Sequence, residues 1–156
     1  MMFAPLLEIL EDAFWSGLTA LGFALAFNVP RRALLACALV GAIGHAARTL
    51  LMAASTGIVL ATLIGSVIIS LLGRALGRFH HVPPPVITVA ALIPMVPGTF
   101  AYRTMLGAVQ LVSAPPELRA PLLDATLING LTTILVTLAL AFGSVVATLL
   151  PRARRS

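Results

Sequence analysis

Charged residues are almost absent from five long stretches of this chain. Each stretch is close to the roughly 20 residues that an α-helix needs to cross a bilayer. They cover residues 13–29, 33–53, 57–73, 86–112 and 122–150. Short connections rich in Pro, Gly, Ser and Asn, which commonly form turns, separate them and leave no room for a soluble domain. The pattern predicts an all-α fold, a polytopic bundle of about five transmembrane helices forming a single domain over residues 1–156.

The composition agrees with lipid as the main solvent. Hydrophobic residues make up 60% of the chain and charged residues 10%, with a mean hydropathy of +1.07. An ordinary soluble domain is about 25% charged, because its surface has to be covered with polar side chains. A soluble enzyme and a disordered tail are therefore excluded. The single cysteine, Cys37, excludes a secreted domain held by disulfides.

The net charge of +5 comes from arginines that gather between the apolar stretches rather than on one basic face. These clusters are Arg31 and Arg32, Arg74 and Arg78, and Arg152, Arg154 and Arg155. Nucleic acid is therefore not an expected partner. Arginines beside membrane spans mark the cytoplasmic side, and with five spans all three clusters share one side. The sequence predicts an outside N-terminus and a cytoplasmic C-terminus in a bacterial inner membrane.

Two prolines and a glycine interrupt the fourth stretch: Pro94, Pro97 and Gly98. Each proline removes a backbone donor and clashes with the preceding helical turn. The interruption begins about eight residues, or roughly 12 Å, past Val86, near the middle of a bilayer core. Broken helices at this depth bind substrates in transporters, which makes these three residues candidate substrate contacts. An ordinary proline kink is the alternative interpretation.

Three motifs give the chain a family resemblance. They are Pro94-x-x-Pro97-Gly98-x-x-x-Tyr102-Arg103, Gly22-Phe23-x-x-x-Phe27-Asn28-Val29-Pro30 and Gly41-Ala42-x-Gly44-His45-x-x-Arg48. Together they resemble the threonine/serine exporter family, and most closely the small subunit of its split, two-gene form, one example of which exports succinate. The resemblance implies a larger membrane subunit as partner. Tyr102 and Asn28, which lie in these motifs, are candidate substrate contacts, and Asn28 is alternatively a residue for interhelical bonding.

Two arginines lie inside predicted spans, Arg48 in the second and Arg103 in the fourth. A charged group near the bilayer centre costs at least about 2.5–3.5 kcal/mol and rarely faces lipid without a function. A guanidinium group grips a carboxylate with two parallel hydrogen bonds, so both arginines are candidate contacts for a carboxylate substrate. For Arg48 the alternative is that its side chain extends to the outer interface.

Proton coupling has two candidates, His45 and Asp12. Histidine changes charge within the physiological pH range, although a buried neutral histidine bonded to a neighbouring helix is more common. Asp12 shares a helical stripe with Ser16 and is alternatively an acid at the outer interface. Asn129 faces the same way as several threonines and is a candidate for a polar pathway or for interhelical bonding. Asp124 is expected in the first turn of the fifth helix, where acids favour the helix dipole.

No catalytic, metal-binding or phosphate-binding motif occurs in the sequence, so neither an enzyme nor a cofactor is expected. The favoured function is a subunit of a secondary exporter for small carboxylate metabolites, such as the dicarboxylate succinate. Two arginines without an evident intramembrane acid to meet an ammonium group lean toward a dicarboxylate. Export of threonine or serine is the first alternative. A membrane assembly subunit without transport activity is the second, and oligomerisation is possible in each case.

Overall fold

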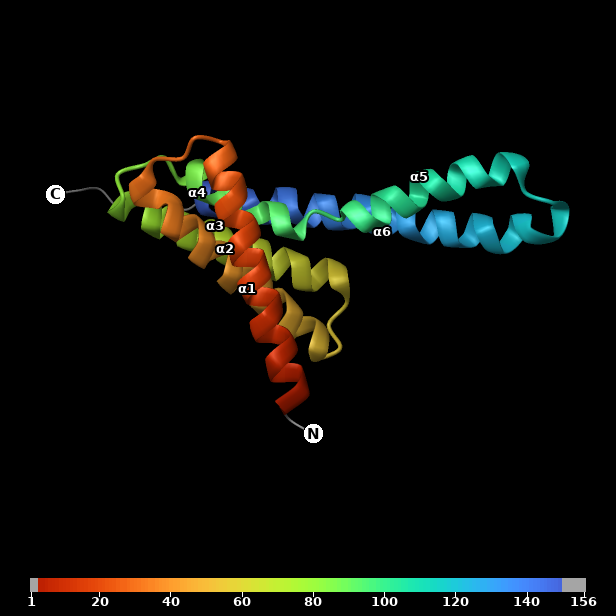
Figure 1. Cartoon of the computed structure of the whole chain (residues 1–156), viewed down its shortest axis with the longest axis horizontal. Coiled ribbons are helices and arrows are strands. Elements are labelled where there is room, and N and C mark those ends of the chain that lie inside the picture. Colours follow the sequence, from red (N-terminus) through yellow and green to blue (C-terminus); the bar gives the residue numbers. More distant parts are fainter. Residues whose placement is uncertain (1–2, 150–156) are drawn as a thin grey trace. The chain divides into compact units, whose positions relative to one another are not determined.

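A computed structural model describes residues 3–149, and in this part of the chain every regular element is a helix (Figure 1). The elements are α1 (Phe3–Ala26), α2 (Arg31–Ala53), α3 (Ile58–Phe79), α4 (Pro84–Leu92), the 3₁₀ helix η1 (Ile93–Met95), α5 (Gly98–Ser113) and α6 (Pro116–Leu149). The all-α prediction is confirmed. The C-terminal arginine cluster and the last residue of the fifth predicted span lie outside the described residues.

Four described helices are long and apolar enough to cross a membrane. Their apolar ranges are Leu7–Ala26, Arg31–Ala53, Ile58–Phe79 and Pro116–Val146. The pair Pro84–Met95 and Gly98–Ser113 is a fifth span if the two parts are counted as one interrupted helix. The fourth predicted span is therefore broken where its prolines lie.

The described chain divides into two compact units, and α6 runs through both. Residues 3–95 together with 139–149 form the first unit, and residues 96–138 form the second. The first unit therefore contains α1 to η1 and the last part of α6. The second unit contains α5 and the first two thirds of α6.

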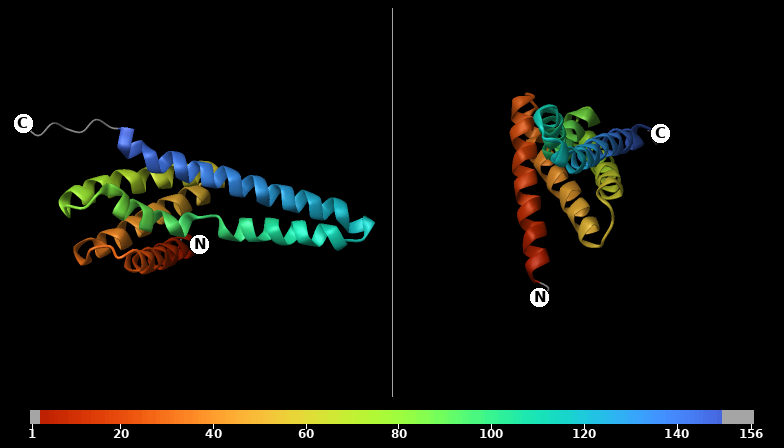
Figure 2. Two further views of the ribbon diagram at one scale, coloured as in Figure 1. Left: turned by 90° about the horizontal axis from the view of Figure 1, so that it is seen from above. Right: turned by 90° about the vertical axis from the view of Figure 1, so that its right-hand side faces the viewer.

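In the first unit, α2 packs against α1 on one side and α3 on the other (Figures 1 and 2). Ala20 and Ala24 are completely buried, and a side chain at Gly41 would collide with Ala20. Across the other interface, a Cβ atom on Gly65 would lie 3.0 Å from the carbonyl oxygen of Gly44. Small residues thus let these helix backbones approach closely, as expected for packing in lipid.

The last part of α6 is fixed to α3 by two serine hydroxyl groups. Ser66 Oγ donates to the carbonyl oxygen of Ala139 at 3.2 Å, and Ser70 Oγ donates to that of Ser144 at 3.0 Å. Gly143 lies directly against Ser66, where any larger residue would collide. Inside a bilayer no water is available to bond a hydroxyl group, so the protein has to supply its hydrogen-bond partner. These two bonds therefore determine how this part of α6 packs on α3.

The first three helices end in the same way, with a residue other than glycine in the left-handed backbone region. These residues are Asn28, Ser55 and His81, with φ values of 55°, 64° and 54°. In each case the next residue donates its N–H to a carbonyl five positions earlier, as in a Schellman motif. Asn28 therefore ends α1, a backbone role that explains an asparagine at this position.

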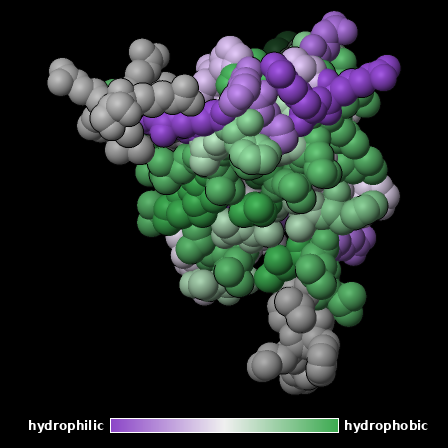
Figure 3. All heavy atoms as spheres, turned by 90° about the vertical axis from the view of Figure 1, so that its left-hand side faces the viewer, coloured by the Kyte–Doolittle hydropathy of each residue, from purple (hydrophilic) through white to green (hydrophobic). Residues whose placement is uncertain are grey.

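The connection after α1 and the connection after α3 lie at the same end of the first unit. Arg32, in the first turn of α2, donates from Nη2 to the carbonyl oxygen of His81 at 3.2 Å. Arg31, Arg32 and Arg78 are exposed there. In the view of Figure 3, hydrophilic residues gather along the top and a broad band of hydrophobic residues lies below them. Two of the three arginine clusters thus share one end, as the predicted topology requires.

The second unit is a helical hairpin of α5 and residues 116–138 of α6. Gly107 on α5 faces the side chain of Thr126, and Gly130 on α6 faces Thr104. The connection is shorter than expected, because α6 begins at Pro116 and contains Pro121. Pro116 is the first residue of the helix, where the missing N–H of proline has no helical partner in any case. Pro121 lies inside the helix, where proline removes the donor that would bond to the carbonyl of Glu117. The prediction that Asp124 lies in the first turn of this helix is therefore wrong, and Glu117 occupies that turn.

Candidate functional site

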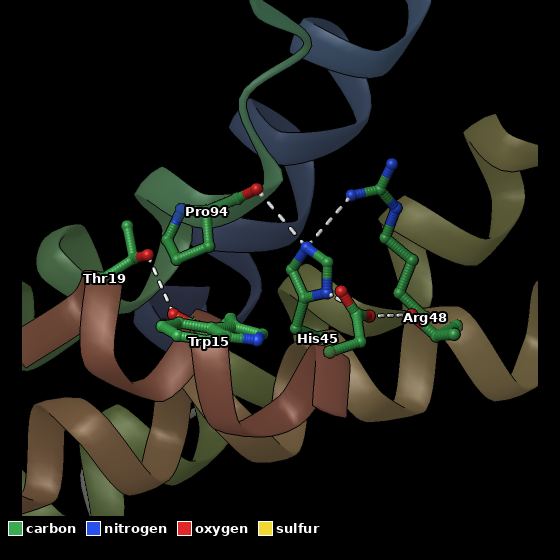
Figure 4. Close-up of polar contacts among 7 residues, drawn as sticks. Trp15, Thr19, His45, Arg48 and Pro94 are labelled. Carbon is green, nitrogen blue, oxygen red and sulfur yellow. Dashed lines mark hydrogen bonds and ion pairs between the residues drawn. The ribbon is translucent and has the colours of Figure 1, made fainter. Parts of the chain in front are cut away.

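A histidine and an aspartate pair between α1 and α2 in the first unit (Figure 4). The Nδ1 atom of His45 lies 2.7 Å from Oδ2 of Asp12, and Thr49 donates its hydroxyl hydrogen to the same oxygen. The side chain of His45 is 13% exposed and that of Asp12 is 34% exposed. Asp12 lies five residues into the apolar part of α1, and His45 lies eight residues before the end of α2. The two proton-coupling candidates therefore form one site.

The interrupted fourth span supplies the other contact of this histidine. The Nε2 atom of His45 lies 3.3 Å from the carbonyl oxygen of Pro94. In a continuous α-helix this oxygen would accept the N–H of Gly98, but Gly98 donates to Val96 instead at 2.8 Å. Pro97 has no N–H for a shorter helical bond. The interruption thus leaves the Pro94 carbonyl available to α2.

Arg48 lies one turn after His45 on α2, and its side chain is half-buried. Its Nη1 atom lies 3.5 Å from Nε2 of His45, and its buried Nε atom has no hydrogen-bond partner. Figure 4 shows the Pro94 carbonyl and the Arg48 guanidinium group approaching the same edge of the His45 ring. The guanidinium group therefore keeps donors for a further acceptor.

The charges of this site balance while His45 is neutral. Asp12 carries one negative charge and Arg48 one positive charge, while His45 adds a second positive charge only when protonated. Nearby charges act strongly where water is scarce, because the local dielectric constant is low. An acid, a guanidinium group and a free carbonyl oxygen together match a small molecule that carries both an ammonium group and a carboxylate.

The remaining candidates from the broken span belong to the second unit. Arg103 and Tyr102 are exposed on α5, and Tyr102 is 66% exposed. Gly98 is the first residue of α5, where its missing side chain leaves open space, and Pro97 directly precedes it and is buried. No bond within this unit holds the guanidinium group of Arg103 in the described structure, so its role as a carboxylate contact stays a prediction.

Two further predicted contacts, Asn28 and Asn129, form no hydrogen bond to the residues of the histidine site within the described chain. Asn28 lies in the turn that ends α1, 16 positions after Asp12. Asn129 is half-buried on α6 in the second unit, and its Nδ2 atom donates to the carbonyl oxygen of Ala125 at 2.7 Å. Its neighbour Thr133 likewise bonds within α6. The side chains of Asn129 and Thr133 are thus bonded within their own helix, and the polar pathway along α6 stays a prediction.

Sequence reasoning missed Thr49. Its position four residues after His45 places both on one face of α2, which was the available signal. A threonine in a membrane helix is common, however, and usually bonds to its own backbone, as Thr62 does here. Only the packing of α1 against α2 shows that Thr49 holds the carboxylate of Asp12.

Among residues 3–149, no group of His, Cys, Asp or Glu side chains is arranged to hold a metal ion. The helices and the ionisable site between them define a multi-pass α-helical membrane protein with a charged site inside its spans. Residues 12–150 match the family model described as "Threonine/Serine exporter, ThrE", so the chain belongs to the threonine/serine exporter family. No solved structure matches the chain.

Proposed function

We propose that this chain is the membrane subunit of a proton-driven exporter for small amino acids of the threonine and serine type. The observation that carries the proposal is the site of Asp12, His45 and Arg48 beside the Pro94 carbonyl. An ionisable site within membrane spans is a costly feature that transport explains. A broken span beside it is the element that transporters use to bind substrate.

The two charged ends of an amino acid have separate partners in this arrangement. The free donors of Arg48 suit the carboxylate, since a guanidinium group binds it with two parallel bonds. Asp12 and the Pro94 carbonyl suit the ammonium group. Asp12 is the intramembrane acid whose apparent absence favoured a dicarboxylate on sequence grounds. Its pairing with His45 removes that reason.

A dicarboxylate such as succinate is the second candidate substrate. The observation that favours it is the second arginine in the broken span, Arg103, which is exposed on α5. Two guanidinium groups are the natural partners of two carboxylates. Direct competition distinguishes the candidates, because an amino acid site binds threonine better than succinate.

We propose further that the chain works with a larger membrane subunit in the inner membrane of a bacterium, N-terminus outside. Many transporters are built from two halves around one site, and five spans are one such half. The exposed polar residues of the second unit, such as Arg103, Gln110 and Thr137, fit a protein partner better than lipid. Expressed alone, the chain is expected to be inactive.

Transport in liposomes tests the proposal. The chain is purified with the proteins that accompany it and reconstituted with radiolabelled threonine inside the vesicles. Exchange with external threonine, inhibited by serine and weakly by succinate, is the expected result. Preferential exchange of succinate would instead support the dicarboxylate function. A complex that moves neither compound would contradict the export function and leave the assembly role.

A further inference from the structure

The carbonyl oxygen of Pro94 is a hydrogen-bond acceptor that the fourth span itself cannot use. Gly98 donates elsewhere, and Pro97 has no N–H to give. A bare carbonyl inside the membrane needs a donor from the protein or from a ligand. His45 is the side chain that reaches it, 3.3 Å away. The acceptor is therefore fixed by the backbone, and its donor depends on the state of the histidine.

The two ring nitrogen atoms of His45 differ in their hydrogen-bond partners. Nδ1 faces the carboxylate of Asp12 at 2.7 Å, which keeps the hydrogen on Nδ1. Nε2 lies between an acceptor, the Pro94 carbonyl, and a donor, Nη1 of Arg48. A neutral ring accepts from Arg48 at Nε2 and leaves the carbonyl free. A protonated ring donates from Nε2 to the carbonyl and repels Arg48.

No other ionisable group faces the ring from the described helices packed around it. Glu8 and Glu11 share α1 with Asp12 but are exposed. In α4, η1 and the described end of α6 there are no ionisable side chains, and those of α3 are Arg74 and Arg78 in its last two turns. The charge at this site thus depends on Asp12, His45 and Arg48.

Resting on the proposed function, we propose that the Pro94 carbonyl is a shared acceptor, taken in turn by protonated His45 and by the ammonium group of the exported amino acid. With neutral His45, Asp12 and Arg48 together match the two charges of the amino acid. With protonated His45, the site carries an extra positive charge, which repels the ammonium group, and its acceptor is occupied. A proton from outside therefore displaces the amino acid.

This competition makes the transport cycle an exchange. The amino acid leaves as a zwitterion without net charge, and one proton enters on Nε2 of His45 and leaves it inside. No bond other than that N–H bond forms or breaks. Each cycle moves one positive charge inward, so the membrane potential as well as the pH gradient drives export.

Two substitutions of His45 separate its nitrogen atoms. Asparagine places a donor where Nδ1 lies, so His45→Asn keeps a partner for Asp12 but has nothing in place of Nε2. Glutamine places a donor near the position of Nε2. In His45→Gln the Pro94 carbonyl therefore has a hydrogen-bond donor at every pH, because an amide N–H does not titrate. The double variant His80→Gln/His81→Gln is the matched control, because both histidines lie in the connection after α3.

The reconstituted complex is measured in two modes, threonine exchange without a gradient and accumulation driven by an imposed pH gradient. For the wild type and the control, acidification should raise the threonine KM by up to about tenfold per pH unit, because one proton competes with one substrate. His45→Asn should lose gradient-driven accumulation, and the threonine KM of its exchange should no longer depend on pH. His45→Gln should show a raised KM at every pH.

A second measurement uses a substrate analogue that lacks the ammonium group. The probe is 3-hydroxybutanoate, which is threonine without its amino group, added as a competitor of threonine exchange. Its inhibition constant should not rise on acidification, because it does not use the Pro94 carbonyl. Gradient-driven accumulation by His45→Asn, or equal acid sensitivity for threonine and the analogue, would overturn the shared acceptor. Loss of all exchange in the wild type would instead overturn the proposed function.

Discussion

The imidazole of His45 and the carboxylate of Asp12 meet at 2.7 Å although 33 positions separate them in the chain. The contact joins the N-terminal half of α1 to α2, and the second ring nitrogen of His45 contacts the carbonyl oxygen of Pro94. Three helical segments that the sequence presents as separate spans therefore share one ionisable group.

Replacing Asp12 with asparagine should impair export without impairing insertion. The amide no longer fixes the hydrogen on Nδ1 of His45 or balances the charge of Arg48. Hydrogen bonds to charged groups are worth about 1.5–3 kcal/mol, which corresponds to a loss of roughly 10- to 100-fold. Initial transport rates in proteoliposomes measure the effect. Glu11→Gln on the exposed side of α1 is the control, and an equal loss there would contradict a specific role for Asp12.

The two prolines of the interruption should differ in their effects. Pro97→Ala restores an N–H that can bond to Ile93, which continues the helix and lets Gly98 donate to residue 94. Pro94→Ala supplies a donor for Ala90 and leaves the carbonyl of residue 94 facing His45. Gradient-driven export should collapse in Pro97→Ala and survive in Pro94→Ala, with both proteins inserted. Normal export by the triple variant Pro94→Ala/Pro97→Ala/Gly98→Ala would show that the interruption is only a tolerated kink.

Arg103 should affect substrate affinity if it contacts a carboxylate. Arg103→Ala is expected to raise KM more for succinate than for threonine, because only succinate has a second carboxylate. Arg103→Lys should rescue partly, since an ammonium group lacks the two parallel donors of a guanidinium group. Arg119→Gln, in the exposed first part of α6, is the control. Unchanged KM values for both substrates would limit Arg103 to a structural role.

Glycine substitutions should separate close helix packing from helix propensity. Gly65→Ala places a methyl group 3.0 Å from the Gly44 carbonyl, and such overpacking costs about 1–3 kcal/mol. Gly22→Ala meets no atom within 4 Å and should stabilise α1 by about 0.5–1 kcal/mol. Thermal unfolding in detergent should therefore shift in opposite directions. A stabilised Gly65→Ala protein would contradict the close approach of α2 and α3.

Cysteine labelling tests the topology. In a Cys37→Ser background, single cysteines at Ser55 and Ala114 should react with an impermeant reagent from outside. Cysteines at Arg31 and Arg78 should react only after the membrane is permeabilised, because the arginine-rich connections belong on the cytoplasmic side. Reaction of Ser55→Cys and Arg78→Cys from the same side would require a different number of spans.

The spans and their interruption were predictable because both depend on local properties of the chain. Long apolar stretches can be recognised from the sequence without knowing how the helices pack. Pro94 and Pro97 remove backbone donors whatever surrounds them. The start of α6 was less predictable. Pro121 reads as the end of a loop, but in the structure it lies inside a helix that begins five residues earlier.

The candidate site was predictable in its members and not in its connections. His45, Arg48 and Asp12 stand out because ionisable residues are rare in apolar helices. Their pairing depends on how α1 rotates against α2, which the buried small residues of α1 determine through contacts distant in sequence. Thr49 escaped notice for the same reason, since a threonine in an apolar helix carries no signal until packing places it beside Asp12. Free carbonyls were expected at the interruption, but their contact with His45 was not.

The serine bonds between α3 and the end of α6 have a consequence for biosynthesis. Ser66 and Ser70 enter the membrane with α3, but their acceptors at Ala139 and Ser144 are synthesised more than 70 residues later. The hydroxyl group of Ser66 has an acceptor before α6 is present, because it also donates to the carbonyl oxygen of Leu63 in its own helix. The first unit is completed only after the entire hairpin of residues 96–138 has left the ribosome. Truncation within α6 should therefore leave a translocated but incompletely assembled chain, which membrane proteases would remove.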